Sequence, residues 1–270
     1  MKKLADYICP ICKNNLTFSQ PSYICTNNHC FDQAKEGYVN LLPVQQKHSK
    51  QPGDNKSMVN ARRDFLSQGY YQPLVDQLIC LQQANAVKEA NVLDAGCGEG
   101  FYTHQFETNH NQVYGVDIAK EAIKKAAKKY KRTHFSVATL SHLPFADEYF
   151  DWMVSVYAPI LEQEFTRVLS AQGYLVTVTP GKRHLFELKE IIYQSAKEHD
   201  DEKEVIRSLK LIDEQQLSYP MVLKTANDVL NLLSMTPFAF KASDKAIEAL
   251  SLKTNFQCQA DFIIRLYQKI

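Results

Sequence analysis

The sequence has 270 residues, of which 45% are hydrophobic and 23% charged, and its formal net charge at pH 7 is +1. This length is sufficient for one large α/β domain and a small second domain. No apolar run is long enough to cross a membrane and no signal peptide opens the chain, so neither a membrane protein nor a secreted one is expected. Seven cysteines, an odd number, also argue against a secreted disulfide framework, and the cytoplasm is the expected compartment.

Charge is unevenly distributed along the chain. Residues 1–63 carry nine Lys and Arg against four Asp and Glu, whereas the remainder carries 22 against 26. A basic segment ahead of an acidic body is typical of a part that contacts nucleic acid. An ordinary solvated surface explains the same bias equally well.

The first motif in the chain is a group of closely spaced cysteines and a histidine. Cys9-Pro-Ile-Cys12 is followed, after twelve intervening residues, by Cys25, and His29 and Cys30 come shortly after. Pairs of soft ligands on two short turns suit tetrahedral zinc, which would stabilise a segment too small to bury a core of its own. A redox Cys-x-x-Cys is the alternative, but no βαβ pattern surrounds the motif. The sequence therefore predicts a structural zinc site, with either the histidine or the last cysteine as fourth ligand.

A polar stretch separates this segment from the body. Residues 45–55 contain a Pro-Gly-Asp turn and are typical of a linker or a basic loop. Two helices are expected to follow, one beginning near residue 54 or 57 and one over residues 74–83. The basic residues of this region that would meet nucleic acid are Lys47, Lys50, Arg62 and Arg63.

A glycine-rich turn follows the first predicted strand of the body. Residues 92–100 read Val-Leu-Asp-Ala-Gly-Cys-Gly-Glu-Gly, in which an apolar run ends in Asp94 and three glycines follow at alternate positions. This pattern predicts a buried parallel strand, a tight turn open to close approach by a ligand, and a helix. An acid at Asp94 would repel a pyrophosphate but suits a cation, such as the amino group and sulfonium of S-adenosylmethionine. The next predicted strand ends at Asp117, the acid expected to hold both ribose hydroxyls.

From residue 91 onward, predicted strands and helices alternate. Further strands are expected over residues 112–117, 134–137, 151–156 and 173–179, and helices over 120–131 and 162–169. Residues 182–257 are expected to form helical insertions with one candidate strand, over residues 216–223. This alternation predicts a doubly wound, Rossmann-like α/β sheet, with its ligand crevice at the carboxyl ends of the strands. The residues expected along this edge are Asp94, Gly96, Gly98, Asp117, Thr139 and Tyr157.

Residues 90–180 resemble class I S-adenosylmethionine-dependent methyltransferases. The fold of that family ends in a reversed strand, which residues 260–268 would supply. Motifs along essentially the whole chain, most of them outside that core, resemble bacterial 23S ribosomal RNA guanine-N1 methyltransferases. These motifs are Cys-Pro-Ile-Cys12, Ala34-Lys-Glu-Gly-Tyr-Val-Asn-Leu-Leu-Pro43, Pro-Gly-Asp54, Ala-Arg-Arg63, Tyr-Gln-Pro-Leu74, Cys-Gly-Glu-Gly100, Tyr-Ala-Pro159, Pro-Gly-Lys-Arg-His-Leu185 and Met-Thr-Pro-Phe238.

The resemblance implies S-adenosylmethionine-dependent methylation of N1 of one guanine in a hairpin of domain II of 23S rRNA. The zinc ligands that it implies are Cys9, Cys12, Cys25 and His29. The cofactor contacts that it implies are Tyr71, Gly98, Glu99 and His184. The family pattern requires no cysteine after its histidine, so Cys30 is a departure from it. A homodimer is compatible with the sequence, which leaves the oligomeric state open.

Tyr157 is the residue expected in the pocket for the target base. It begins the segment Tyr-Ala-Pro directly after the fourth predicted strand. Enzymes that modify bases take them out of the stack, and an extruded guanine would stack on this ring. A buried tyrosine that merely ends a strand explains the pattern almost as well. The sequence assigns no carboxylate as a general base.

The expected domains are residues 1–43 for zinc binding and RNA recognition, 44–73 as a basic linker with a leading helix, and 74–270 for methyl transfer. Two other functions stay open. One is a methyltransferase for a small molecule or a protein, which would leave the basic zinc segment without a role. The other is a non-catalytic RNA-binding zinc protein with a vestigial methyltransferase fold, which would have no need of Asp94, the glycines and Asp117.

Overall fold

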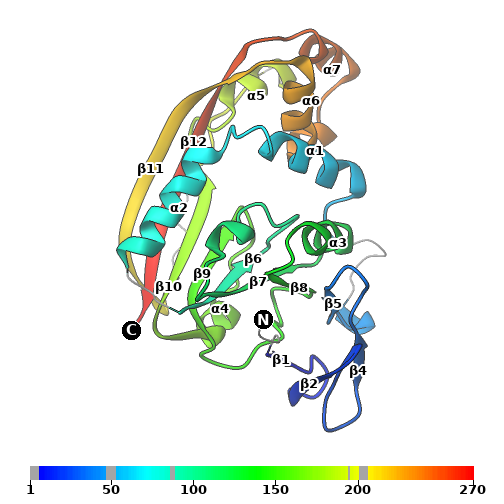
Figure 1. Cartoon of the computed structure of the whole chain (residues 1–270). Helices are drawn as coiled ribbons and strands as arrows, with labels where there is room; N and C mark the ends of the chain where they lie inside the picture. Colours follow the sequence, from blue (N-terminus) through cyan, green and yellow to red (C-terminus); the bar gives the residue numbers. More distant parts are fainter. Residues whose placement is uncertain (1–5, 47–52, 86–88, 194, 201–205) are drawn as a thin grey trace.

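An eight-stranded sheet forms the centre of the molecule, and a four-stranded sheet lies beside it at the N-terminal end (Figure 1). The computed structural model describes residues 6–46, 53–85, 89–193, 195–200 and 206–270. The large sheet has the order β11-β12-β10-β9-β6-β7-β8-β5. Its strands are β5 (Val39–Asn40), β6 (Asn91–Ala95), β7 (Gln112–Asp117), β8 (His134–Val137), β9 (Phe150–Val156), β10 (Leu169–Pro180), β11 (Leu209–Leu223) and β12 (Phe256–Lys269).

The sheet confirms the doubly wound fold predicted from the sequence. Strands β5 to β10 run parallel, and β12 pairs antiparallel with β10 and carries β11 on its other side. The central strands are apolar because both faces are covered, and Val92 and Leu93 are fully buried on opposite faces. The helices are α1 (Lys56–Leu66), α2 (Gln72–Ala84), α3 (Lys120–Lys129), α4 (Glu162–Val168), α5 (Phe186–Ile192), α6 (Ala226–Ser234) and α7 (Asp244–Ser251).

The helices divide between the two faces of the sheet. Apolar residues of α2, α5, α6 and α7 share one core cluster with Val92, whereas α4 shares another with Leu93. Helix α1 begins within the range expected from the sequence, and its cap residue Asn55 accepts a hydrogen bond from Met58 N. Within the described residues, no helix is both long and apolar enough to span a bilayer.

Two elements differ from the sequence prediction. The segment after the glycines is not an α-helix but the short 3₁₀ helix η2 (Thr103–Phe106), because the Thr103 hydroxyl bonds the Asp94 carboxylate at 2.6 Å and holds the chain against the end of β6. Strand β11 begins at Leu209 rather than at residue 216, because it pairs with β12 along its whole length. The two other 3₁₀ helices are η1 (Val44–Gln46) and η3 (Pro237–Phe240).

The N-terminal segment forms a small antiparallel sheet in the order β1-β2-β3-β4. The Tyr7 ring packs against the Phe145 ring of the body at a centroid distance of 5.4 Å, and Ile8 N donates to Pro144 O. Strand β5, which follows this sheet, pairs with β8 of the body. The segment predicted as a separate domain is therefore docked on the large sheet. The strands of the small sheet are β1 (Tyr7–Ile8), β2 (Asn15–Ser19), β3 (Ser22–Ile24) and β4 (Cys30–Asp32).

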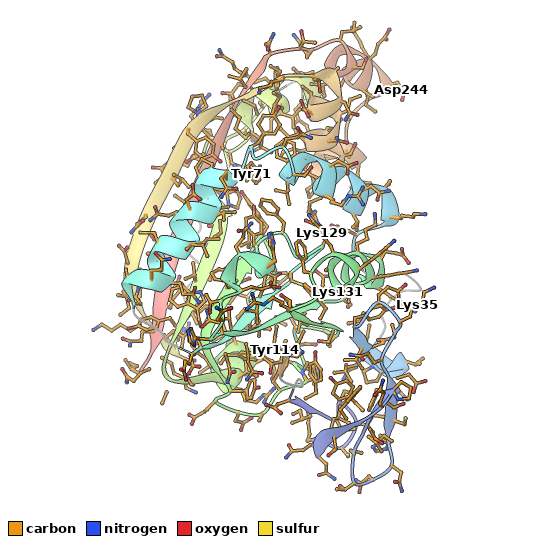
Figure 2. The ribbon with its side chains drawn as sticks, in the orientation of Figure 1. Lys35, Tyr71, Tyr114, Lys129, Lys131 and Asp244 are labelled. Atoms are coloured by element: carbon orange, nitrogen blue, oxygen red, sulfur yellow. The ribbon has the colours of Figure 1, made fainter. Side chains whose placement is uncertain are left out.

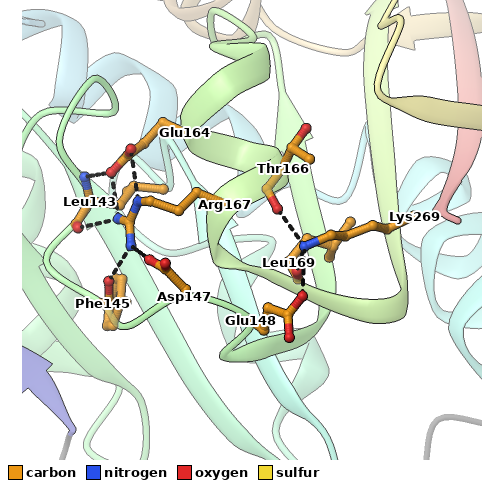
Figure 3. Close-up of polar contacts among 9 residues, drawn as sticks. All are labelled: Leu143, Phe145, Asp147, Glu148, Glu164, Thr166, Arg167, Leu169 and Lys269. Atoms are coloured by element: carbon orange, nitrogen blue, oxygen red, sulfur yellow. Dashed lines mark hydrogen bonds and ion pairs between the residues drawn. The ribbon is translucent and has the colours of Figure 1, made fainter.

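Two cations tie the connections at the amino ends of β9 and β10 together (Figure 3). Arg167 of α4 donates to two carbonyls and pairs with two carboxylates, and Lys269 of β12 binds the turn after α4. These contacts stabilise the edge of the sheet opposite the expected ligand crevice. The partners are Leu143 O, Phe145 O, Asp147 and Glu164 for Arg167, and Glu148, Thr166 O and Leu169 O for Lys269.

Candidate active site

A cleft with a volume of about 690 Å³ lies at the carboxyl ends of the central strands. Its walls come from α1, from the loops that follow β6, β7, β9 and β10, and from the segment after α6. Tyr71, labelled in Figure 2, enters the wall from the junction between α1 and α2. Eight residues predicted from the sequence line the cleft together: Tyr71, Gly96, Gly98, Glu99, Asp117, Thr139, Tyr157 and His184.

The glycine turn has the backbone conformation that its sequence predicts. Gly96 has φ 85° and Gly98 has φ 55°, both in the left-handed region that favours glycine. The main-chain amides of Gly96 and Cys97 both donate to Val116 O, which ties the turn to β7. A Cβ atom on Gly96 would lie 2.4 Å from Cβ of Ala158. Glycine is therefore required at this position for the loop after β9 to rest on the turn.

Asp94 lies behind the turn rather than in the cleft wall. Among the described residues, the lining includes Gly96 and Gly98 of the turn but not Asp94. The Asp94 carboxylate is buried, with 1% of the residue exposed, and accepts a hydrogen bond from the Thr103 hydroxyl. Burial raises the pKa of Asp94 to about 7. Asp94 therefore lies behind the wall of the cleft, and its expected role toward a cation stays a prediction.

Asp117 is placed as the sequence predicted, at the end of β7 in the cleft wall. Its Oδ2 accepts from Gly98 N at 2.9 Å and its Oδ1 accepts from Ala119 N at 2.7 Å. Burial raises its pKa, whereas these two main-chain bonds lower it. A carboxylate oxygen can accept more than one hydrogen bond, so each oxygen keeps capacity for a hydroxyl such as those of a ribose.

Glu99 is a second buried acid in the wall, with 4% of its surface exposed. Burial raises its pKa to about 7, although Lys129 and Arg63 lower it from nearby. Arg62 also lines the cleft, where it pairs with Asp54 and donates to Met235 O at 3.0 Å. The Arg62 guanidinium therefore faces the cleft, and its expected contact with nucleic acid stays a prediction.

A cluster of aromatic side chains closes the other end of the cleft. His184 Nε2 lies 3.1 Å from the Tyr157 hydroxyl and 3.4 Å from the Tyr71 hydroxyl. His184 is 5% exposed, and burial lowers its pKa to about 3, so the ring is neutral at pH 7. Tyr157 has φ 56° and its side chain is 44% exposed, with the ring in the cleft and the hydroxyl turned inward. The interpretation of Tyr157 as a fully buried strand end is therefore wrong.

His199 is a cleft residue that the sequence reasoning missed. It lies beside Phe238, which belongs to one of the motifs quoted above, with 6.5 Å between ring centroids. Its Nε2 is buried and has no hydrogen-bond partner among the described residues. No local pattern marks it, since residues near 199 are polar and irregular and reach the cleft only through the fold.

Four of the five candidate zinc ligands come together between β1 and β4. The ligand atoms of this cluster all lie within 4.8 Å of one another, and Cys12 Sγ lies 3.6 Å from Cys25 Sγ. In a tetrahedral zinc site, zinc–sulfur bonds of about 2.3 Å place two sulfurs about 3.8 Å apart, so the observed separation matches such a site. Cys30 lies outside it, exposed, with Sγ 3.9 Å from Asp32. The cluster consists of Cys9, Cys12, Cys25 and His29.

Comparison with known proteins assigns both parts of the chain. Residues 7–50 match a family model described as the N-terminal part of RlmA, and residues 86–232 match a methyltransferase domain. The 23S rRNA (guanine(748)-N(1))-methyltransferase of Streptomyces fradiae is 34% identical over 193 residues, which are 69% of this chain and 68% of that protein. The chain belongs to the family of 23S rRNA (guanine-N1)-methyltransferases.

One further relative agrees with this assignment, and one solved structure shares the fold of the body. The Bacillus subtilis protein YxjB, named after the same reaction, is 28% identical over 93% of each chain. The crystal structure of the B. subtilis protein YcgJ superposes with a TM-score of 0.50 at 21% identity, covering 71% of this chain and 96% of that one. The second comparison concerns the fold of the methyltransferase body alone.

Binding of S-adenosylmethionine to this methyltransferase should tighten as the pH rises from about 6 to 8. The acids at 94 and 99 have pKa values of about 7 in the protein without ligand, and a cationic ligand favours their charged forms, so binding lowers both pKa values and releases protons. Calorimetry in buffers of different ionisation enthalpy measures this release. Glu99→Gln should reduce the number of protons released, whereas the exposed control Glu121→Gln should not. Binding without proton release would contradict the interpretation that these two acids respond to the charge of the cofactor.

Proposed function

We propose that the protein transfers the methyl group of S-adenosylmethionine to N1 of one guanine in a hairpin of domain II of 23S rRNA. The observation that carries this proposal is the pairing of two features in one chain. A cleft with a glycine turn and a strand-end acid suits the cofactor, and a docked domain with a four-ligand metal cluster matches the RlmA family. The named relatives act on guanine N1 of 23S rRNA according to their names.

The residues of the cleft fit the proposed cofactor. The open glycine turn admits the methionine part, and Asp117 keeps acceptor capacity for both ribose hydroxyls. Apolar side chains beside it, such as Ile118 and Leu140, suit an adenine ring. The cofactor supplies a methyl group already activated on a sulfonium, so much of the catalysis that remains for the protein is to bring the base into line and to exclude water.

The proposed path of the RNA runs from the cleft over α3 to the N-terminal domain. Lys120, Lys124 and Lys128 recur at intervals of four on this helix and are exposed. Lys131 donates to the carbonyl of Glu36 in the N-terminal domain, and Figure 2 shows Lys35 on the side of that domain nearest Lys131. These lysines of α3 and the N-terminal domain, called the basic strip below, suit phosphate contacts, which position an RNA without reading its sequence. Lys47 and Lys50, expected to take part, lie outside the described residues.

Primer extension across 23S rRNA tests the proposed function directly. N1-methylguanine cannot form a Watson–Crick pair, so the polymerase should stop at one guanine of a domain II hairpin when the rRNA has been incubated with protein and S-adenosylmethionine. Omission of the cofactor is the control. Transfer of labelled methyl to a metabolite or a protein instead would favour a different substrate, and absence of any transfer with bound cofactor would favour the vestigial fold.

Purified protein should hold one zinc ion per chain, bound by the cluster of Cys9, Cys12, Cys25 and His29. Cys12→Ser should release the metal and destabilise the small sheet, since metal binding stabilises segments of this size. The matched control is Cys30→Ser, which should retain zinc because that thiol lies outside the cluster. Metal analysis that finds zinc lost from Cys30→Ser but kept in His29→Ala would contradict the ligand set.

Charge reversal on the basic strip should weaken RNA binding without affecting cofactor affinity. In Lys124→Glu/Lys128→Glu, the slope of log K against log salt should fall by roughly one for each lysine that binds a phosphate in the wild type. Lys245→Glu on the exposed surface of α7 is the control for the change in net charge. Equal salt slopes in the wild type and in the double variant would show that α3 is ordinary surface.

A further inference from the structure

His184 is enclosed by groups that occupy both of its ring nitrogens. The main-chain amide of Asp261 donates to Nδ1 at 3.1 Å, and Nε2 lies 3.1 Å from the hydroxyl of Tyr157. An amide N–H can only donate, so Nδ1 accepts and carries no proton. The neutral ring therefore carries its proton on Nε2, because the partner of one nitrogen decides the state of the other.

This tautomer decides which way the Tyr157 hydroxyl points its own proton. Nε2–H donates to the phenol oxygen of Tyr157, which is nearer than that of Tyr71 at 3.4 Å. A phenol oxygen that accepts in this way directs its O–H elsewhere. Burial raises the pKa of Tyr157 well above 10, so the hydroxyl stays protonated at neutral pH and acts as a donor rather than as a base.

Asp261 is itself fixed in place by the strands around it. Its carboxylate accepts from Arg183 N at 3.0 Å and from Gln216 Nε2 at 2.7 Å, and its carbonyl accepts from Gly181 N. A Cβ atom on Gly181 would lie 2.5 Å from this carboxylate, so the turn after β10 packs directly on β12. The tautomer of His184 is therefore a consequence of how β10, β11 and β12 are assembled.

Tyr157 is held at the cleft by a strained backbone. Its φ of 56° is rare for a residue with a side chain, and its amide donates to Val178 O at 3.0 Å. The next residue, Ala158, rests on Gly96 of the glycine turn. Strain of this kind persists only where surrounding contacts hold it, and it is concentrated at functional sites. The ring thus stands in the cleft beside the turn that suits the cofactor.

On the basis of the proposed function, we propose that His184 positions Tyr157, and that the Tyr157 hydroxyl donates a hydrogen bond to O6 of the target guanine. When N1 gives up its proton to water, negative charge spreads onto O6, and this hydrogen bond stabilises it. The N1 lone pair then forms the bond to the methyl carbon, while the electrons of the broken S–C bond stay on sulfur. The products are N1-methylguanine, S-adenosylhomocysteine and one proton.

A double-mutant cycle on the full-length protein tests this arrangement, with turnover measured at saturating S-adenosylmethionine and rRNA hairpin. Tyr157→Phe keeps the ring and should lower kcat by about 10²-fold, as removal of an oxyanion donor does. His184→Phe should lower kcat to a similar extent, and the double variant should be no worse than either single variant, because His184 acts through Tyr157. Raising the pH should restore part of the activity, since guanine then loses the N1 proton unaided.

Further measurements separate positioning from cofactor binding and from folding. The calorimetric affinity for S-adenosylmethionine should be unchanged in Tyr157→Phe, and His184→Gln, which retains a donor, should recover part of the kcat that His184→Phe loses. Tyr174→Phe, in β10 and outside the lining of the cleft, is the matched control. If His184→Phe does not fold, the pH profile of Tyr157→Phe still decides the role of the hydroxyl.

Three results would overturn the inference. Multiplicative effects in the double variant would mean that His184 acts independently of Tyr157. Weaker cofactor binding with normal kcat would assign the hydroxyl to the cofactor, and full activity of Tyr157→Phe would make it structural. Each of these leaves N1 methylation by the wild-type protein intact, whereas failure of the wild type to methylate guanine N1 would overturn the proposed function itself.

Discussion

The close contact between the glycine turn after β6 and the loop after β9 is the constraint on which the cleft depends. No side chain fits at Gly96, because Ala158 already occupies that space. The turn is held from below by Val116 O and from the side by Asp117, whose carboxylate accepts from Gly98 N. This packing brings Tyr157 to the edge of the cleft. The position of the Tyr157 ring therefore depends on one glycine in the first strand–turn unit.

The packing around the glycine turn also buries two acids, Asp94 and Glu99. Two carboxyl groups with pKa values near 7 lie under and beside the turn, and no cationic side chain among the described residues forms an ion pair with either of them. Removing a carboxylate from water disfavours its charge. Nearby Lys129 and Arg63 offset this cost only in part at Glu99, and a cationic ligand would offset it further. The cleft is thus electrostatically more stable with such a ligand than without it. Such a site favours a sulfonium over a neutral molecule of the same shape.

The N-terminal domain is joined to the body by the sheet itself. Strand β5 adds to the edge of β8, and the Tyr7 ring packs among the rings of Tyr114 and Phe145. Its orientation relative to the cleft is therefore set by main-chain pairing and apolar packing rather than by a free linker. A small domain held in this way presents a fixed surface beside the body. The basic face of α3 lies between this domain and the cleft.

The sequence by itself determined the features that depend on neighbouring residues: the glycine turn, Asp117 at a strand end, the alternation of strands and helices, and the spacing of the metal ligands. Only the tertiary structure decided which side chains meet across long separations. It brought His29 rather than Cys30 to the cysteines, turned Arg62 into the cleft, and joined Tyr157 and His184, which follow β9 and β10, to Asp261 within β12. Local patterns report periodicity and backbone preference, whereas these contacts arise from the order in which β9, β10 and β12 lie side by side.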